Sequence, residues 1–213
     1  MVASFAAPHT PLVALQSTLV GRGYAVLAPQ DVAALAGVPV DALTALVPSW
    51  DDLRHDRYLK DGGNYRKRRH SCFVAEAGAL RQVPHRMHWQ SEDYNALHGG
   101  MERWFVEAHQ FRIDTHDGIG RPTPEGAHRD GVDFVAVLLV NRHAIKGGET
   151  RVFQADGPDG QRFTLAEPWS LLLLDDARMI HESTPIQPVD EYGYRDTLVL
   201  TFRANGFQGD DAG

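Results

Sequence analysis

The sequence predicts an α+β protein that is mostly β, with helices in its first half and a jelly-roll-like core of short strands in its second half. A chain of 213 residues favours a single domain over 1–213 and can bury a substantial core without cross-links. From about residue 110, short apolar runs alternate with turn residues, which is the pattern of a sandwich or barrel. Earlier in the chain the apolar spacing is helical in several places. We therefore expect a helical or mixed part over about 1–109, a β core over about 110–205 and a flexible tail over 206–213.

The first helix is predicted from the residues at its ends. Thr10 suits an N-cap, Pro11 suits the first helical position, and Gly21 with Gly23 would end the helix before a strand over 24–27. Its apolar side chains are expected to share one face, and they are Leu12, Leu15, Leu19 and Val20. Further helices are expected over 31–36, 41–47 and 101–108.

The strands of the second half are predicted from apolar runs between turn residues. Two Gly-rich turns are expected over 146–148 and 156–160. The expected strands cover 134–140, 149–154, 161–165, 170–174, 180–186 and 197–202.

The last predicted strand separates polar from apolar side chains. Alternation places Arg195, Thr197 and Arg203 on one face and Leu198 and Phe202 on the other. The polar face either meets water or lines a functional cavity. If the arginines point inward, the N-terminal helices must cover the apolar outer face.

Composition narrows the class of protein. Hydrophobic residues make up 43% and charged residues 23%, as in ordinary globular proteins. The single cysteine, Cys72, excludes an internal disulfide framework and fits a reducing cytoplasm, which is the expected location. We find no signal-peptide pattern and no apolar run approaching the ~18 residues of a membrane span, so no membrane partner is expected. The net charge of −7 argues against non-specific binding of nucleic acid.

The only His-x-Asp of the chain is formed by His128 and Asp130. Residues i and i+2 of a strand point the same way, so this imidazole and carboxylate can take adjacent coordination positions. A second histidine would complete a facial set with open positions for a co-substrate and O2, as in non-haem Fe(II) oxygenases. The alternative is a surface pair in a turn. The position directly before the most apolar strand, 134–140, favours the metal.

His181 is the candidate for the second histidine. It lies 53 residues after His128, at the start of a predicted strand that follows an apolar run. Alternatively, it is a strand-edge histidine bonded to a neighbour. His143, His116 and His109 compete for the role, but His143 follows the far end of the most apolar strand, and the other two precede the β core.

Arg195 and Thr197 are candidates for binding a carboxylate. One strand, a turn and a return strand would bring Arg195 beside His181, which lies 14 residues earlier. A guanidinium and a hydroxyl on the same inward side suit a carboxylate, so a dicarboxylate co-substrate could bridge the iron and Arg195. The alternative for Arg195 is a surface salt bridge with a neighbouring acidic residue.

Together these residues resemble the Fe(II)/2-oxoglutarate-dependent dioxygenase superfamily, whose pattern is His-x-Asp, a distant histidine and then Arg-x-Ser/Thr. His128, Asp130, His181, Arg195 and Thr197 supply these parts in order. The resemblance implies a double-stranded β-helix (jelly-roll, cupin-like) core with the helices packed on its outside. It also implies Fe(II) on the first three residues, 2-oxoglutarate on the last two, and hydroxylation by O2 with release of succinate and CO2.

Several further runs look like the bacterial free-amino-acid hydroxylases of the isoleucine 4-hydroxylase type. These runs are 58–69, 89–90, 94–95, 125–134, 147–150 and 181–186. This closer resemblance covers roughly 50–205. It implies that the substrate is a small molecule, a free aliphatic L-amino acid, which is hydroxylated or, at a thioether, sulfoxidised.

The basic run 65–70 allows three interpretations: contact with the substrate carboxylate, a solvated face, or a nucleic-acid patch. If the run is extended, Arg66 and Arg68 point one way and Tyr65 points the other. The resemblance favours substrate contact, with Tyr65, Arg66, Arg68 and Gln90 as the candidates.

Three rival functions remain open at this stage. The first is a cupin-like metal-binding or sensing protein without oxygenase turnover, against which the absence of a His-x-His pair and the presence of Arg195 and Thr197 weigh. The second is a base-demethylating dioxygenase, which would need a broad basic face. The third is a non-enzymatic interaction module. The sequence leaves the oligomeric state open, with a homodimer as one option.

Overall fold

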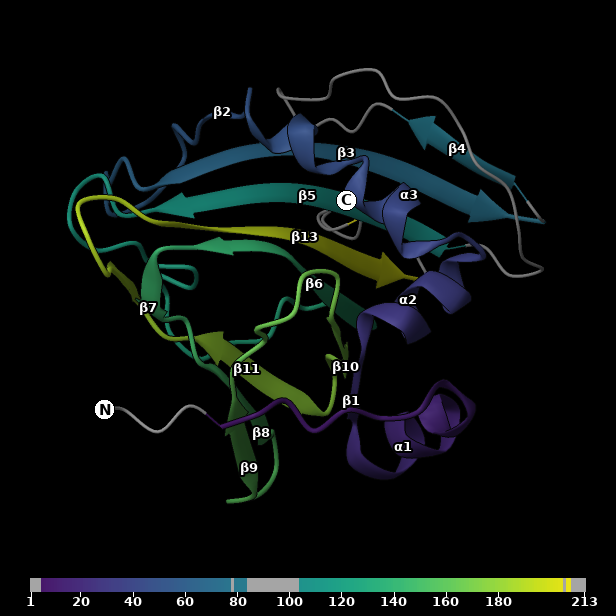
Figure 1. The fold of residues 1–213 in the computed structure, drawn as a ribbon. Coiled ribbons are helices and arrows are strands. Elements are labelled where there is room, and N and C mark those ends of the chain that lie inside the picture. Colours follow the sequence, from purple (N-terminus) through teal and green to yellow (C-terminus); the bar gives the residue numbers. More distant parts are fainter. Residues whose placement is uncertain (1–4, 78, 84–103, 205, 208–213) are drawn as a thin grey trace.

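The protein is described by a computed structural model over residues 5–77, 79–83, 104–204 and 206–207. Its strands form one large sheet and two smaller ones, and neighbouring strands are antiparallel (Figure 1). The prediction of a mostly β, jelly-roll-like protein with few helices is therefore confirmed.

The large sheet has eight strands, in the order β1-β10-β6-β13-β5-β3-β2, with β4 paired to β3. In chain order they are β1 (Tyr24–Leu27), β2 (Arg54–His55), β3 (Arg66–Glu76), β4 (Ala79–Val83), β5 (Trp104–Asp114), β6 (Phe134–His143), β10 (Leu171–Asp175) and β13 (Tyr194–Arg203).

The smaller sheets have the orders β11-β8-β9 and β12-β7. Their strands are β7 (Ile145–Gly147), β8 (Thr150–Gln154), β9 (Gly160–Phe163), β11 (Met179–Ser183) and β12 (Ile186–Pro188). The predicted strand over 180–186 is thus two strands that belong to different sheets.

Two apolar cores lie on opposite faces of the large sheet. The first joins it to the β11-β8-β9 sheet and contains Tyr24, Val26, Val135, Leu139, Val152, Phe163, Leu165, Leu172, Leu174 and Met179. The second joins it to the helical segments and contains Leu27, Val32, Trp50, Leu53, Ala136, Leu138, Val140, Trp169 and Leu171. Residues of β6 enter both cores in alternation, which explains why its sequence is continuously apolar.

The helices lie along one side of the large sheet (Figure 1). They are α1 (Leu15–Arg22), α2 (Pro29–Ala36) and α3 (Val40–Thr44), with 3-10 turns at Leu12–Ala14 and Val47–Trp50. Gly23 ends α1 in the left-handed conformation, with a φ of 80°, as the glycine pattern predicted. Val20 departs from the prediction because its side chain is exposed rather than on the packed face.

The predicted helix over 101–108 is wrong for the residues that the structure describes, because 104–108 belong to β5. β5 lies between β3 and β13 in the centre of the large sheet. The part of the chain expected to be helical or mixed therefore contributes long strands to the large sheet.

The two faces of β13 agree with the prediction. Arg195 and Thr197 are 4% and 3% exposed, and Val199 packs on the first core, so this face points inward. Leu198 and Leu200 pack in the second core, beneath the helical segments. The indole Nε1 of Trp50 donates to the carbonyl oxygen of Thr197 at 3.3 Å, which ties the helical layer to this strand.

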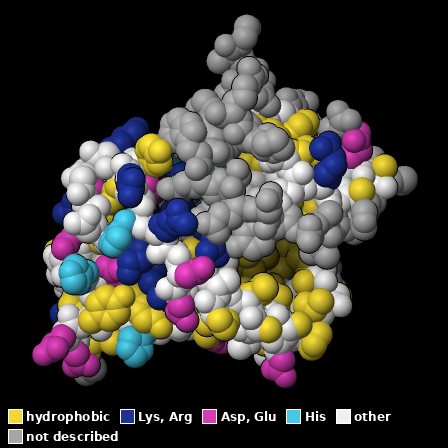
Figure 2. All heavy atoms as spheres, turned by 90° about the horizontal axis from the view of Figure 1, so that it is seen from above, with side chains coloured by type: hydrophobic (Ala, Val, Ile, Leu, Met, Phe, Trp, Pro, Cys, Tyr) yellow, Lys and Arg dark blue, Asp and Glu magenta, His cyan; other side chains and the backbone are white. Residues whose placement is uncertain are grey.

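An apolar hollow of about 430 Å³ lies at one end of the large sheet. It is lined by Leu19, Ala75, Trp104, Val106, Phe134, Leu173 and Phe202. Seen from above, hydrophobic side chains surround a hollow, while basic, acidic and histidine side chains are interspersed elsewhere on the same face (Figure 2).

No single helix among the described residues has the length and apolar character of a membrane span. The segments Pro29–Ala36 and Val40–Trp50 reach that standard only together, and they are bent by 91° at the break between them.

Candidate metal centre

His128 and His181 lie directly opposite one another. Each backbone N–H donates to the other residue's carbonyl oxygen, at 3.0 Å and 2.9 Å, in an isolated antiparallel bridge. The two imidazole rings are 4.7 Å apart at their centroids. The main chain therefore fixes the spacing of the two histidines.

The carboxylate of Asp130 lies between the two imidazoles. Its Oδ1 is 3.6 Å from Nε2 of His128, and its Oδ2 is 3.7 Å from Nε2 of His181. One donor atom from each of the three residues lies within 4.8 Å of the others. The prediction that these three side chains meet is confirmed.

The hydrogen bond of the His128 imidazole suits a metal. Nδ1 of His128 lies 2.8 Å from the carbonyl oxygen of Gly126 and must donate to it, because a carbonyl only accepts. Nε2 of His128 then faces Asp130 and is available to a metal once it has lost its proton. His181 is 8% exposed and presents Nε2 to the same carboxylate.

The ionisation of the three side chains is coupled. The hydrogen bond with Asp130 raises the pKa of His128 to about 9, against the opposing effect of burial. Burial lowers the pKa of His181. Burial would raise the pKa of Asp130, but the hydrogen bond with His128 and the charges of both histidines lower it overall. A divalent cation among these groups would replace the proton on His128 and balance the carboxylate.

Asp176 fixes the backbone of the segment that carries Asp130. Its carboxylate accepts the backbone N–H groups of Asp130, Gly131 and Val132, at 3.1, 2.8 and 3.1 Å. Its side chain is buried, and its own N–H donates to the carbonyl oxygen of Asp133 at 3.1 Å. Asp176 is thus a positioning residue for the site.

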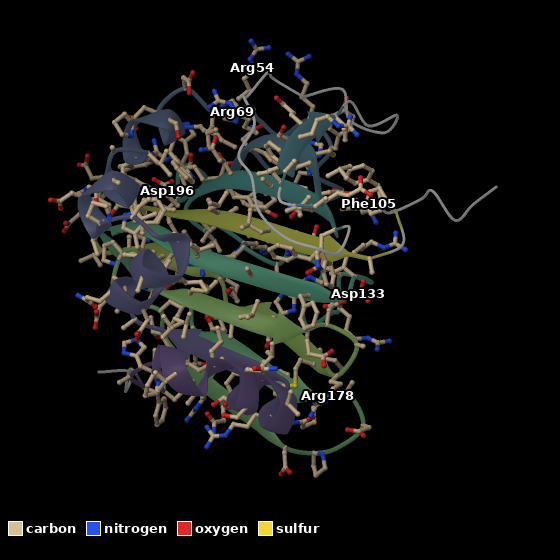
Figure 3. All side chains as sticks on the ribbon, turned by 90° about the vertical axis from the view of Figure 1, so that its right-hand side faces the viewer. Arg54, Arg69, Phe105, Asp133, Arg178 and Asp196 are labelled. Carbon is tan, nitrogen blue, oxygen red and sulfur yellow. The ribbon has the colours of Figure 1, made fainter. Side chains whose placement is uncertain are left out.

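Asp133 connects this segment to the large sheet. Its backbone N–H donates to the carbonyl oxygen of Phe202 at 2.9 Å, and its carboxylate accepts the N–H of Ala204 at 2.8 Å. Figure 3 shows Asp133 and Phe105 beside one end of the sheet, and Asp196 near the start of β13 at the other end.

Arg195 is a buried cation with unused donors. Its Nε and Nη2 have no hydrogen-bond partner among the residues that the structure describes. Burial, reinforced by the charge of Arg142, lowers the pKa of Arg195 to about 9. A buried, unpaired guanidinium is costly, so this site favours an anion. Thr197, on the same face, adds a hydroxyl.

Arg142 is a second cation at this position, which the sequence did not indicate. It lies directly opposite Arg195 on β6, and its Nη2 donates to the carbonyl oxygen of Gly147 at 2.8 Å. Gly148 lies against both arginines, since an added Cβ there would be 2.9 Å from Nη1 of Arg142. The second positive charge strengthens the attraction of this position for an anion.

Arg66 and Arg68 point to the same side and share one acidic neighbour. Nε and Nη2 of Arg66 lie 2.9 Å and 2.8 Å from Oδ2 of Asp56, whereas Nε of Arg68 is 3.8 Å away. Nε of Arg68 is buried and has no hydrogen-bond partner in the described part of the chain, and burial lowers its pKa. Arg68 therefore has the freer guanidinium.

The other members of the basic run point elsewhere, as alternation predicted. Lys67 pairs with Asp114 at 3.3 Å, and Arg69 pairs with Asp52 at 2.8 Å. Much of the charge in this run is therefore paired within the protein.

Tyr65 has its own set of contacts. It packs with Leu59, Ile113 and Ile186, and its hydroxyl donates to Asp61 at 2.5 Å. Its role in substrate binding stays a prediction, and so does that of Gln90, which lies outside the described residues.

The competing histidines are not among the three residues that meet, although the charge of His109 helps to lower the pKa of Asp130. His143 and His116 are exposed, and His143 stands beside the ring of Tyr194. His109 lies on β5, stacked between the rings of His70 and Phe111.

Comparison with known proteins points to the same chemistry. The pattern of the family described as 2OG-Fe dioxygenase matches residues 47–108 and 104–201. A crystal structure of a bsmA homolog from Methylobium petroleophilum PM1 is 43% identical, with a TM-score of 0.85, over 98% of this chain and 99% of that one. No curated protein sequence matches the chain.

Two more distant structures share the fold. The Fe(II)/(alpha)ketoglutarate-dependent dioxygenase TqaL is 18% identical, with a TM-score of 0.72, over 93% of this chain and 89% of that one. IDO from Bacillus thuringiensis is 16% identical, with a TM-score of 0.70, over 92% of this chain and 96% of that one. The match to the family covers most of the chain and favours an oxygenase over a cupin-like protein without turnover. The chain belongs to the 2OG-Fe dioxygenase family, whose members use Fe(II), 2-oxoglutarate and O2.

Proposed function

We propose that this dioxygenase hydroxylates, or at a thioether sulfoxidises, a free aliphatic L-amino acid. The observation that carries the proposal is a second guanidinium, that of the half-buried Arg68, on the same inner face as Arg195 and 3.8 Å from the carboxylate of Asp56. Its Nε has no hydrogen-bond partner among the described residues. One guanidinium can anchor the co-substrate while the other binds the carboxylate of the substrate.

The strand register supports this proposal, because it brings Arg68 and Thr197 close together on one face of the sheet. Arg68 lies opposite Phe111 on β5, and Phe111 lies opposite Thr197 on β13. Adjacent strands are about 4.8 Å apart, so Arg68 and Thr197 are about 10 Å apart across the sheet. Phe111 lies between them in register, and its ring, which packs against the ring of His109 and the guanidinium of Arg66, adds an apolar group to this face.

The remaining roles follow from the site geometry. His128, Asp130 and His181 would hold Fe(II), and Arg195 and Thr197 would bind the distal carboxylate of 2-oxoglutarate. Bound together, Fe(II) and 2-oxoglutarate supply the activation of O2 that C–H hydroxylation needs. The protein's part is to orient both carboxylates and to exclude water from the buried face of β13.

Purified protein reconstituted with Fe(II), 2-oxoglutarate and O2 tests the proposal against a panel of free L-amino acids. We expect one or a few aliphatic amino acids to stimulate succinate release and to gain one oxygen atom, as measured by mass spectrometry. His128→Ala should remove this activity and leave a folded protein. If no amino acid stimulates succinate release by the iron-loaded wild type, the substrate assignment is wrong.

Arg68 provides a residue-level test of the same proposal. Losing one charge-assisted contact to the substrate carboxylate costs about 1.5–3 kcal/mol, so Arg68→Ala should raise the KM for the amino acid roughly 10- to 100-fold. The KM for 2-oxoglutarate should stay near its wild-type value. Arg54, exposed on β2 and directly opposite Arg68 in register, is the matched control, and Arg54→Ala should change neither constant.

A further inference from the structure

We propose that His70, Cys72 and Glu107 form a second metal site, for a divalent ion of the zinc type that accepts a thiolate. This site is separate from the His128–Asp130–His181 centre and does not rest on the proposed amino-acid substrate. All three residues lie on the neighbouring strands β3 and β5.

Strand geometry brings the three donors together. His70 and Cys72 are two positions apart on β3, so their side chains share one face. Glu107 lies directly opposite Cys72 on β5. One donor atom from each residue lies within 4.8 Å of the others, as in the His-Asp-His group.

The distance between sulfur and nitrogen also fits a metal. Sγ of Cys72 lies 3.5 Å from Nε2 of His70. Zinc binds sulfur at about 2.3 Å and imidazole nitrogen at about 2.0–2.1 Å, so the two ligand atoms of a tetrahedral site lie about 3.5 Å apart.

Burial adds a charge argument. His70, Cys72 and Glu107 are 1%, 1% and 8% exposed. A divalent cation bound by one thiolate and one carboxylate forms a neutral centre, which suits a buried position. The thiolate favours zinc or a similar ion over Mg²⁺ or Ca²⁺, which prefer oxygen ligands.

His109 contacts two of the proposed ligands, His70 and Glu107. It lies directly opposite His70, and the two rings stack with centroids 4.8 Å apart and planes 15° from parallel. Its Nε2 lies 3.5 Å from Oε2 of Glu107. Such outer contacts orient ligands and typically contribute 10- to 100-fold to metal affinity.

Cobalt(II) is a selective probe for this site because Cys72 is the only cysteine in the chain. A thiolate bound to Co(II) gives a strong near-ultraviolet charge-transfer band, whereas histidine and carboxylate ligands do not. Full-length protein is titrated with Co(II), and absorbance and bound metal are measured together.

We expect about two Co(II) ions per chain and a charge-transfer band that zinc removes by competition. Cys72→Ser should abolish the band and lower the number of bound Co(II) ions to about one per chain. Glu107→Gln should weaken Co(II) binding at the thiolate site.

The double variant His128→Ala/His181→Ala should keep the band and lose the Co(II) ion of the His-Asp-His centre. His109→Ala should weaken cobalt binding at the thiolate site by about 10- to 100-fold.

Two results would overturn the second site. One is a folded, cobalt-saturated wild type without a charge-transfer band, which would leave these residues as a buried polar network. The other is loss of the band in the double histidine variant, which would mean that Cys72 belongs to the first centre. Neither result bears on amino-acid turnover, so failure here is distinct from failure of the proposed function.

Discussion

At the scale of single residues, Asp176 shows how one carboxylate can position a metal site without touching the metal. It accepts three consecutive N–H groups from the segment that carries Asp130. These hydrogen bonds fix the backbone on which Asp130 projects toward both histidines. Because the carboxylate is buried, no water can replace it as the acceptor without rearrangement.

Asp176→Asn should therefore weaken the affinity for Fe(II) about 10- to 100-fold, because the amide keeps one acceptor oxygen and brings an unmatched NH2 group to three donors. Anaerobic Fe(II) titration measures the effect. Asp175→Asn is the control, since Asp175 contacts only Arg178 in the described ion pairs, at 3.7 Å. Equal Fe(II) affinity in wild type and Asp176→Asn would contradict the positioning role.

The ionisation of Arg195 predicts how co-substrate binding depends on pH. Its pKa is lowered to about 9, so the guanidinium is charged below pH 9 and becomes neutral above it in the ligand-free protein. Only the charged form attracts a carboxylate. The affinity for 2-oxoglutarate should thus be constant from pH 7 to about pH 8.5 and fall at higher pH, by up to about tenfold per pH unit.

Titration of 2-oxoglutarate into metal-loaded protein at several pH values measures this dependence. Arg195→Ala should bind 2-oxoglutarate weakly at every pH and lose the alkaline decline. An Arg195→Ala variant with the same alkaline decline as wild type would assign the titration to another group.

At the scale of elements, the short turn after β7 shapes the anion site. Gly147 has a φ of 82°, and a Cβ there would overlap the carbonyl oxygen of Pro185. Gly147→Ala should lower the free energy of unfolding by about 1–3 kcal/mol, from the left-handed backbone and the overlap. Thermal denaturation measures the change. Gly157→Ala is the control, because its nearest neighbour would be an ordinary 3.9 Å contact, and it should be close to neutral.

The elements also show how far the sequence could predict this fold. Strands such as β6 and β10 pack apolar side chains on both faces, so their apolar runs identified them correctly. β5 was mistaken for a helix because its inner face carries Glu107 and His109 instead of apolar residues. These two polar residues interrupt the alternation by which strands are recognised.

The same reasoning explains which site residues were found. The pattern of His-x-Asp, a later His and Arg-x-Thr is visible in the residue types and their order along the chain, so its members could be predicted. The contributions of Asp176 and Arg142 depend on contacts with distant segments, namely the loop at Asp130 and the strand that carries Arg195. No spacing within the sequence reveals such contacts.

At the scale of the whole molecule, ligands should stabilise the fold. A carboxylate bound at Arg195 and Arg142 would join β13 and β6 of the large sheet. A ligand present at 100 times its Kd adds about 2.7 kcal/mol, which corresponds to a rise in Tm of roughly 5–10 °C for a chain of this size. Differential scanning fluorimetry with an inert divalent metal and 2-oxoglutarate should show that rise. In Arg195→Ala the metal should still raise the Tm, whereas 2-oxoglutarate should add little. A full 2-oxoglutarate effect in that variant would place the co-substrate elsewhere.

The backbone bridge between His128 and His181 has a consequence for the cost of capturing iron. Since main-chain hydrogen bonds set the distance between the two imidazoles, the chain loses its conformational freedom there when the protein folds and not when the ion arrives. The ligands are preorganised, and either imidazole can be exchanged for another side chain without breaking the backbone bridge between β11 and the segment that carries His128. Because the main chain sets the spacing and the side chains supply the ligands, the ligands can change while the fold stays the same.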